Sequence, residues 1–114
     1  MIIKFNPIRT DDQVSYLVRG DMLMINGEQF DFSRVEEGDV LPQSAVSSWW
    51  MAGDVTRVNG EIELTLLLPN PWNYSQAQAF PVPIHMTVDG VVPLPESLPY
   101  ITPMSTPTKE PIDD

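Results

Sequence analysis

Apolar and polar residues alternate along most of this chain, and short Gly-containing pairs interrupt the alternation. Asn26-Gly27, Asn59-Gly60 and Asp89-Gly90 each lie between two apolar stretches, and Gly20-Asp21 lies between two more. A two-residue hairpin turn needs positive φ at one or both central residues, which Gly and Asn adopt at low cost. The four pairs therefore predict four hairpins and a chain that is mostly antiparallel β-structure.

The alternation predicts strands on both sides of these turns. Residues 61–68 form the clearest one, because Ile62, Leu64, Leu66 and Leu68 share one face and polar side chains occupy most of the other. The other expected strands cover residues 2–5, 14–19, 22–25, 28–32, 54–58, 82–88 and 91–92.

The strand before Asp89 is expected to point Ile84, Met86 and Val88 inward. Pro81 and Pro83 lack the N–H group of a ladder bond, which predicts that this strand begins at a sheet edge.

The pattern is less regular between residues 33 and 53. Asn6-Pro7 is expected to end the first strand, and Pro42 suits the first turn of a short helix through Ser48. Short strands with tight turns elsewhere predict an all-β domain over residues 1–92, a small antiparallel β-sandwich or open barrel built of hairpins. A length of 114 residues with 42% apolar residues suits one domain with a real core.

Residues 93–114 differ in composition from the rest. Prolines recur among Ser, Thr and acidic residues, which blocks both helix and central strand and predicts an extended, acidic tail. The tail either is solvated or lies along a partner or a second copy of the chain. In the second case its apolar anchors are Leu94, Leu98, Tyr100, Ile101 and Met104.

The charge balance is strongly acidic, with 16 Asp and Glu against 6 Lys and Arg and a formal net charge of −10. Basic side chains supply most of the affinity for nucleic acid, and here they are few and scattered, so neither nucleic acid nor an anionic membrane surface is expected as a partner. The acidity either keeps the protein soluble or fits a basic protein partner. With no cysteine and no apolar run near about 18 residues, we expect synthesis in the cytoplasm without disulfides.

No catalytic, metal-binding or cofactor signature stands out. His85 is the single histidine and is expected on the polar face of its strand. Acidic pairs such as Asp11-Asp12 and Glu61/Glu63 are expected on solvated surfaces. Glu61 and Glu63, two positions apart on an open sheet face, are not expected to face a cleft. We therefore expect a protein that is not an enzyme and that uses no cofactor.

Four aromatic residues are the better candidates for function. Trp49 and Trp50 are adjacent, so in extended chain they point to opposite sides, and Trp72 and Tyr74 lie in a loop rich in Pro and Asn. One member of each pair could pack into the core. The alternative is a protein-binding surface, because exposed aromatic residues are typical of interface hot spots.

One pattern of turns and strands runs through the first part of the chain: Ile25–Ser33, Gly38–Pro42, Gly53–Val55, Arg57–Gly60 and Leu64–Pro69. In this pattern, from the N-terminus to about Pro95, the chain resembles a family of short, largely uncharacterised bacteriophage and prophage proteins. Such proteins are encoded beside tail and tail-fibre genes. The resemblance implies a genomic setting and transfers no functional residue.

These observations lead to one main hypothesis and two alternatives. The main hypothesis is a non-enzymatic structural component of the phage tail, at the tail tip or tail-fibre attachment, located in the virion. Its partners would be tail-fibre or baseplate proteins, with further copies of itself in a symmetric assembly. The alternatives are a tail-fibre assembly chaperone absent from the virion and an acidic inhibitor of a host defence protein.

Overall fold

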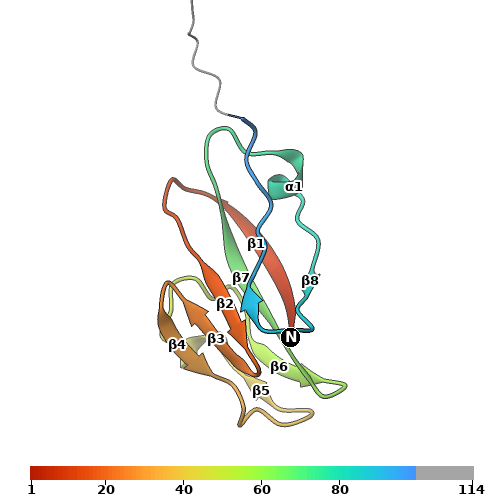
Figure 1. The fold of residues 1–114 in the computed structure, drawn as a ribbon. Coiled ribbons are helices and arrows are strands. Elements are labelled where there is room, and N and C mark those ends of the chain that lie inside the picture. The colour runs from red at the N-terminus through yellow and green to blue at the C-terminus, as the bar shows by residue number, and fades with distance from the viewer. Residues whose placement is uncertain (100–114) are drawn as a thin grey trace, which may run out of the picture.

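The computed structural model describes residues 1–99, which form two β-sheets with little helix (Figure 1). One sheet has the order β5-β6-β7-β1-β8 and the other has the order β4-β3-β2-β9. The strands of the first sheet are β1 (Ile2–Arg9), β5 (Val40–Leu41), β6 (Val55–Val58), β7 (Glu61–Asn70) and β8 (Ile84–His85). Those of the second are β2 (Tyr16–Arg19), β3 (Met22–Ile25), β4 (Glu28–Asp31) and β9 (Gly90–Val91). The prediction of a mostly-β fold rich in antiparallel pairs is confirmed.

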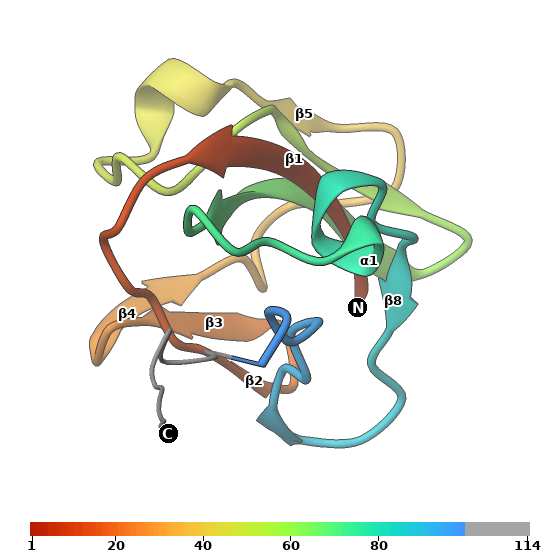
Figure 2. The same ribbon diagram turned by 90° about the horizontal axis from the view of Figure 1, so that it is seen from above.

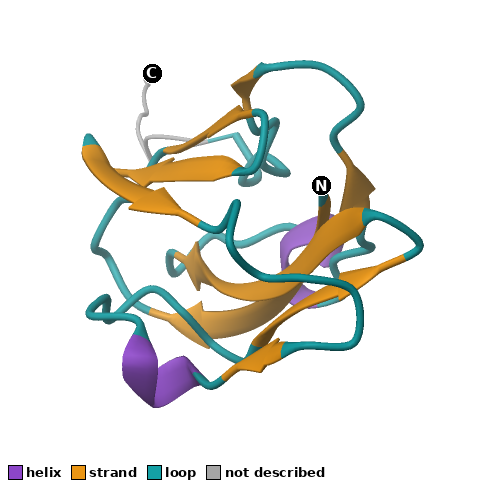
Figure 3. Cartoon of the chain, turned by 90° about the horizontal axis from the view of Figure 1, so that it is seen from below, coloured by secondary structure: helices purple, strands orange, loops and turns teal. Residues whose placement is uncertain are grey.

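Helix in the described residues is limited to two short turns (Figure 3). The predicted helix from Pro42 to Ser48 is a single 3₁₀ turn, η1 (Gln43–Ala45), because it has almost no apolar face to bury. The second turn, α1 (Gln76–Ala79), lies in a segment that was expected to be loop.

Three of the four predicted hairpin turns are present. In the β3–β4 turn, Asn26 and Gly27 have φ of 50° and 85°, and in the β6–β7 turn, Asn59 and Gly60 have φ of 53° and 81°. Positive φ at both central residues is what a type I′ turn requires. The Gly20-Asp21 turn joins β2 to β3 with positive φ at the glycine.

The fourth predicted hairpin, at Asp89-Gly90, is wrong. β8 pairs with β1 in one sheet and β9 pairs with β2 in the other, so this segment crosses between the sheets. β8 and β9 therefore do not pair with each other across a two-residue turn. Each pairs instead with a strand longer than itself. As a result Ile84 and Met86 pack against the core as expected, whereas Val88 is 72% exposed.

The longest strand pairing is parallel, in a chain that was expected to be mostly antiparallel. β1 runs beside β7 from Ile2 opposite Glu63 to Arg9 opposite Asn70. β1 also continues through Asn6-Pro7, which were expected to end it. β8 pairs only with Ile2 and Ile3, so Pro7 lies where β1 has a strand on one side, a position at which sheets tolerate proline.

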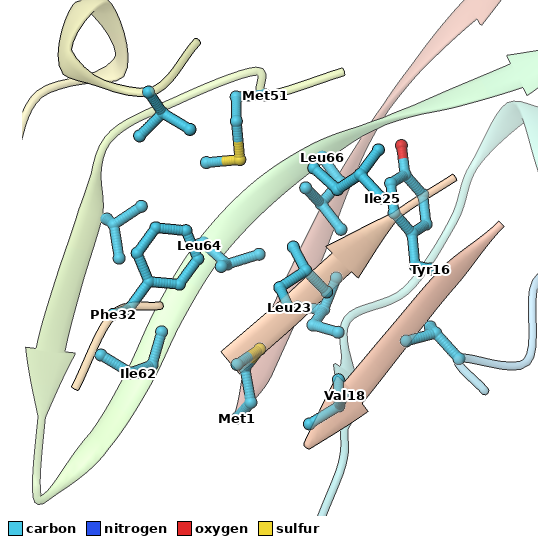
Figure 4. Packing of buried hydrophobic residues seen from close by; sticks show 14 of the residues in the cluster. Met1, Tyr16, Val18, Leu23, Ile25, Phe32, Met51, Ile62, Leu64 and Leu66 are labelled. Carbon is cyan, nitrogen blue, oxygen red and sulfur yellow. The ribbon is translucent and has the colours of Figure 1, made fainter. Parts of the chain in front are cut away.

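The two sheets face each other across one hydrophobic core (Figures 2 and 4). The alternation predicted for β7 is confirmed, since its apolar face is fully buried. The most buried side chains from the two sheets are Ile3, Tyr16, Leu23, Val55, Ile62, Leu64, Leu66 and Leu68.

Two polar contacts link one sheet to the other. The Tyr16 hydroxyl donates to the Leu67 carbonyl at 2.6 Å. Arg57, whose side chain is 15% exposed, donates to the carbonyls of Val35 and Gly60 and pairs with the Asp21 carboxylate at 2.9 Å. Arg57 on β6 therefore fastens the β2–β3 turn of the opposite sheet.

Candidate functional site

Exposed apolar side chains gather at one end of the molecule. This apical end consists of residues 71–82, which include α1, together with residues 93–99 (Figure 1). Its most exposed apolar side chains are Trp72, Tyr74, Phe80, Val82 and Leu98. Scattered surface apolar residues are ordinary, but several on adjoining segments point to a contact surface.

Local sequence explains the shape of the apical end. Pro71 follows β7, and its carbonyl accepts the Tyr74 N–H at 3.2 Å, which makes a tight turn. Ser75 and Gln78 then form a capping box, with the Ser75 Oγ accepting the Gln78 N–H and the Gln78 Oε1 accepting the Ser75 N–H. Pro81 prevents α1 from continuing.

A buried amide fastens α1 to the sheet. Asn70, at the end of β7, donates from Nδ2 to the Gln78 carbonyl at 2.8 Å. Asn70 and Gln78 are the two buried polar residues within residues 1–99. The loop that carries Trp72 and Tyr74 is thus held at both ends.

The described part of the tail is also fixed to this loop. The Leu98 N–H donates to the Asn73 carbonyl at 2.9 Å, and the Asn73 Nδ2 donates to the Leu98 carbonyl at 2.8 Å. Leu94 is partly buried against the core, and Leu98 is exposed. The structure therefore holds Leu98 beside Asn73, the residue between Trp72 and Tyr74 in the loop. The predicted anchors Tyr100, Ile101 and Met104 lie outside the described residues.

Two clefts open at the apical end, and residues of α1 and of the tail line both of them. The polar cleft has a volume of about 460 Å³ and is lined by Asp11, Asp12, Trp72, Gln78 and Ser97, among others. The apolar cleft has a volume of about 280 Å³ and is lined mainly by Ala77, Phe80, Val82, Ile84, Leu94 and Pro95. Neighbouring residues of the same segments thus face different clefts.

The other predicted aromatic pair lies elsewhere in the chain. Trp49 is 66% exposed, whereas Trp50 packs against the core. The two residues lie in a turn, closed by the Met51 N–H donating to the Ser48 carbonyl at 3.3 Å, and not in the extended chain that was expected. Their rings meet edge to face, with centroids 6.4 Å apart. Trp50 is positioned by its carbonyl, which accepts the Leu67 N–H at 2.8 Å. Trp49 and Trp50 belong to the segment between η1 and β6 and not to the apical end.

His85, Glu61 and Glu63 lie in side-chain pairs at the surface. His85 is exposed, with its Nε2 2.9 Å from the Glu61 Oε2, and this hydrogen bond lowers the pKa of the Glu61 carboxyl. Glu63 pairs with Lys4 at 2.6 Å. Across residues 1–99 there is no group of three or more His, Asp or Glu side chains that could hold a metal ion.

Comparison with known proteins gives no relative. No family model, curated protein or solved structure matches this chain. In the part of the chain that the structure describes, no helix is long and apolar enough to cross a bilayer.

Proposed function

We propose that this protein is a non-enzymatic structural component of a bacteriophage tail that binds other tail proteins through its apical end. The position would be the tail tip or the tail-fibre attachment. The observation that supports a contact role is the exposure of Trp72, Tyr74, Phe80 and Val82 on segments that hydrogen bonds hold in place. The tail setting rests on the sequence resemblance to phage proteins.

The size of the exposed surface supports a binding role. A Trp side chain buries about 200 Å² when it is fully covered, and each Å² contributes about 25 cal/mol. Trp72 is 66% exposed, so covering the exposed part of its side chain is worth about 3 kcal/mol. Phe80 is 74% exposed, and a partner that covered both rings would gain a large part of the free energy of a stable complex.

The finer fold assignment is part of the same proposal. We assign the domain to the β-sandwiches and not to the open barrels, because no hydrogen-bonded strand pair joins the two sheets within residues 1–99. A sandwich leaves its connections at two ends, and the apical end is one of them. Such ends are where β-sandwiches commonly carry binding loops.

Mass spectrometry of purified particles tests the proposed role. Particles of the phage or induced prophage that encodes the chain are expected to contain this protein at a constant ratio to the tail proteins. Its absence from intact particles would overturn the structural role. If it then co-purified with unassembled fibre protein, the assembly-chaperone alternative would replace it. If its deletion left particles intact but impaired growth only on defended hosts, the inhibitor alternative would replace it.

A further inference from the structure

The two clefts of the apical end differ in chemistry and lie side by side. We propose that they bind one extended peptide segment of a protein partner, with an Arg or Lys side chain in the polar cleft and an aliphatic side chain in the apolar cleft. This inference deepens the proposed function and rests on it for the partner being a protein. It names the chemistry that the partner must carry.

The polar cleft has the groups that a cationic side chain needs. The Trp72 indole lines it, and Trp is the aromatic side chain that attracts a cation most strongly. The carboxylates of Asp11 and Asp12 line it as well. Asp11 already pairs with Arg9 at 3.1 Å, whereas no cationic group within residues 1–99 forms a salt bridge with the Asp12 carboxylate. Asp12 therefore offers a carboxylate for a second cation.

The cleft is held in shape before any ligand arrives. Gln78, which lines it, is only 5% exposed and is fixed by the capping box with Ser75. The Asp12 N–H is fixed by the Thr10 Oγ1 at 3.1 Å. A site that needs little reordering binds with a smaller entropic cost.

Charge favours a cationic partner over a neutral one. The chain carries a net charge of −10, and several of its few basic side chains are already paired with carboxylates, namely Lys4, Arg9 and Arg57. Such a surface raises the local concentration and the association rate of a cationic partner. A neutral sugar could stack on Trp72, but it would neither neutralise Asp12 nor use the apolar cleft.

The way that α1 and the tail divide between the clefts indicates a spacing for the ligand side chains. Ala77 lines the apolar cleft and Gln78 the polar one, and in the tail the same division separates Pro95 from Ser97. Two residues of extended chain span about 6.6 Å, which is also the distance between side chains on one face of an extended peptide. The peptide should therefore carry its cationic and aliphatic residues two positions apart.

The rim of the apolar cleft favours recognition by side chains over strand addition. Pro81, Pro93 and Pro95 line this cleft and have no N–H group to donate. Strand addition needs a row of backbone donors and acceptors. An aliphatic side chain needs only the apolar lining.

The test is a titration followed by ¹H–¹⁵N NMR, with the Trp indole N–H signals as reporters and Trp72→Phe used to assign the signal of Trp72. The probes are the peptides Ac-Arg-Ser-Leu-NH₂, its Lys analogue, its neutral citrulline analogue and Ac-Arg-Ser-Ser-NH₂. We expect the Trp72 signal to shift and the Arg and Lys peptides to bind about fivefold more tightly than the citrulline peptide. The Arg-Ser-Leu peptide should also bind about fivefold more tightly than the Arg-Ser-Ser peptide.

Matched variants distinguish binding at this site from nonspecific attraction to negative charge or to exposed aromatic rings. Asp12→Asn and Trp72→Ala should each weaken the Arg-Ser-Leu peptide about fivefold. Glu28→Gln removes an exposed acid on β4, and Trp49→Ala removes an indole that is 66% exposed, as Trp72 is, so neither should change binding. Phe80→Ser should cancel the advantage of Leu over Ser in the peptide.

Several outcomes would overturn the inference. Equal binding of the Arg and citrulline peptides would contradict a cation site, as would equal losses in Glu28→Gln and Asp12→Asn. Binding of lactose or methyl glucoside at Trp72 without binding of any peptide would make the cleft a sugar site. If no peptide binds while the protein is present in virions, this inference fails and the proposed function stands. If the peptides bind while the protein is absent from virions, the proposed tail role fails alone.

Discussion

Replacing Tyr16 by Phe removes one hydroxyl group from the centre of the core and leaves the ring in place. The effect depends on what else could satisfy the Leu67 carbonyl. In a regular antiparallel pair, Leu67 and Trp50 would exchange two backbone bonds. Here Leu67 donates to the Trp50 carbonyl, but the Trp50 N–H donates to the Ser48 Oγ at 3.2 Å. The Tyr16 hydroxyl donates to the Leu67 carbonyl in its place, at 2.6 Å.

The magnitude follows from this geometry. Tyr16→Phe creates no cavity beyond one oxygen atom, so the cost comes from the buried carbonyl that loses its donor, about 1–3 kcal/mol. For a domain of this size, a loss of about 2 kcal/mol lowers the melting temperature by about 8 °C. The free energy of unfolding, measured by urea titration with Trp fluorescence, should fall by this amount.

Tyr74→Phe is the matched control, because Tyr74 is 48% exposed. It should change the free energy of unfolding by less than about 0.5 kcal/mol. If Tyr16→Phe unfolds at the same urea concentration as the wild type, the hydroxyl does not replace the missing ladder donor.

Alkaline pH provides a second readout of the same residue. Burial raises the pKa of the Tyr16 hydroxyl well above its ordinary value near 10. Above about pH 10 the unfolded chain releases this proton and the folded chain keeps it, so the contribution of Tyr16 to stability is lost as pH rises through the folded pKa. Tyr16→Phe should therefore lose less stability than the wild type above pH 10. An identical decline in both proteins would contradict the assigned burial.

Three further predictions concern other parts of the fold. Arg57→Met should lower the free energy of unfolding by about 2–3 kcal/mol, because two carbonyls and a carboxylate lose a charged donor. Arg34 is exposed, so Arg34→Met should change the free energy of unfolding by less than about 0.5 kcal/mol in the same urea titration. The hydrogen bond from His85 lowers the pKa of the Glu61 carboxyl. The contribution of this pair to stability is therefore present above the ordinary pKa of a carboxyl and is lost as pH falls through the pKa of the folded state. Glu61→Gln should make the melting temperature depend less on pH between about pH 5 and pH 3. Gly27→Ala should cost about 1 kcal/mol by thermal unfolding, because φ is 85° there.

Local patterns predicted the local structure well. The alternation in β7 and the Asn-Gly turns depend on neighbouring residues alone, and both are present. The capping box of α1 was also readable, as Ser75 followed three residues later by Gln78, but its single turn has no apolar periodicity to draw attention to it.

Long-range pairing could not be predicted in the same way. A parallel pair needs a crossover and has no turn motif between its strands, so no local sequence pattern near β1 or β7 predicts that they pair. The Asp89-Gly90 pair carries the composition of a hairpin turn, yet its flanks pair with different sheets. The Asp89 side chain instead accepts the Gly20 N–H at 2.8 Å, across the turn of another hairpin.

In the candidate site, too, the local features could be predicted from the sequence and the long-range contacts could not. Sequence composition singled out Trp72 and Tyr74 as candidates either for the core or for a binding surface, and both are exposed. It gave no reason to connect them with Asp11 and Asp12. The parallel register places Arg9 opposite Asn70, so the residues that follow each strand meet at the apical end and share the polar cleft.

We propose that the apical end attaches this protein to the phage tail. The most direct measurement is the amount of the protein in purified particles, determined by quantitative mass spectrometry, when the gene is complemented with wild type, Trp49→Ala or the double variant Trp72→Ala/Phe80→Ser. Equal melting temperatures would first establish that all three are folded. We expect the wild type and Trp49→Ala to be present at the same ratio to the tail proteins and the double variant to be strongly depleted. Incorporation of the double variant at the level of the wild type would contradict it.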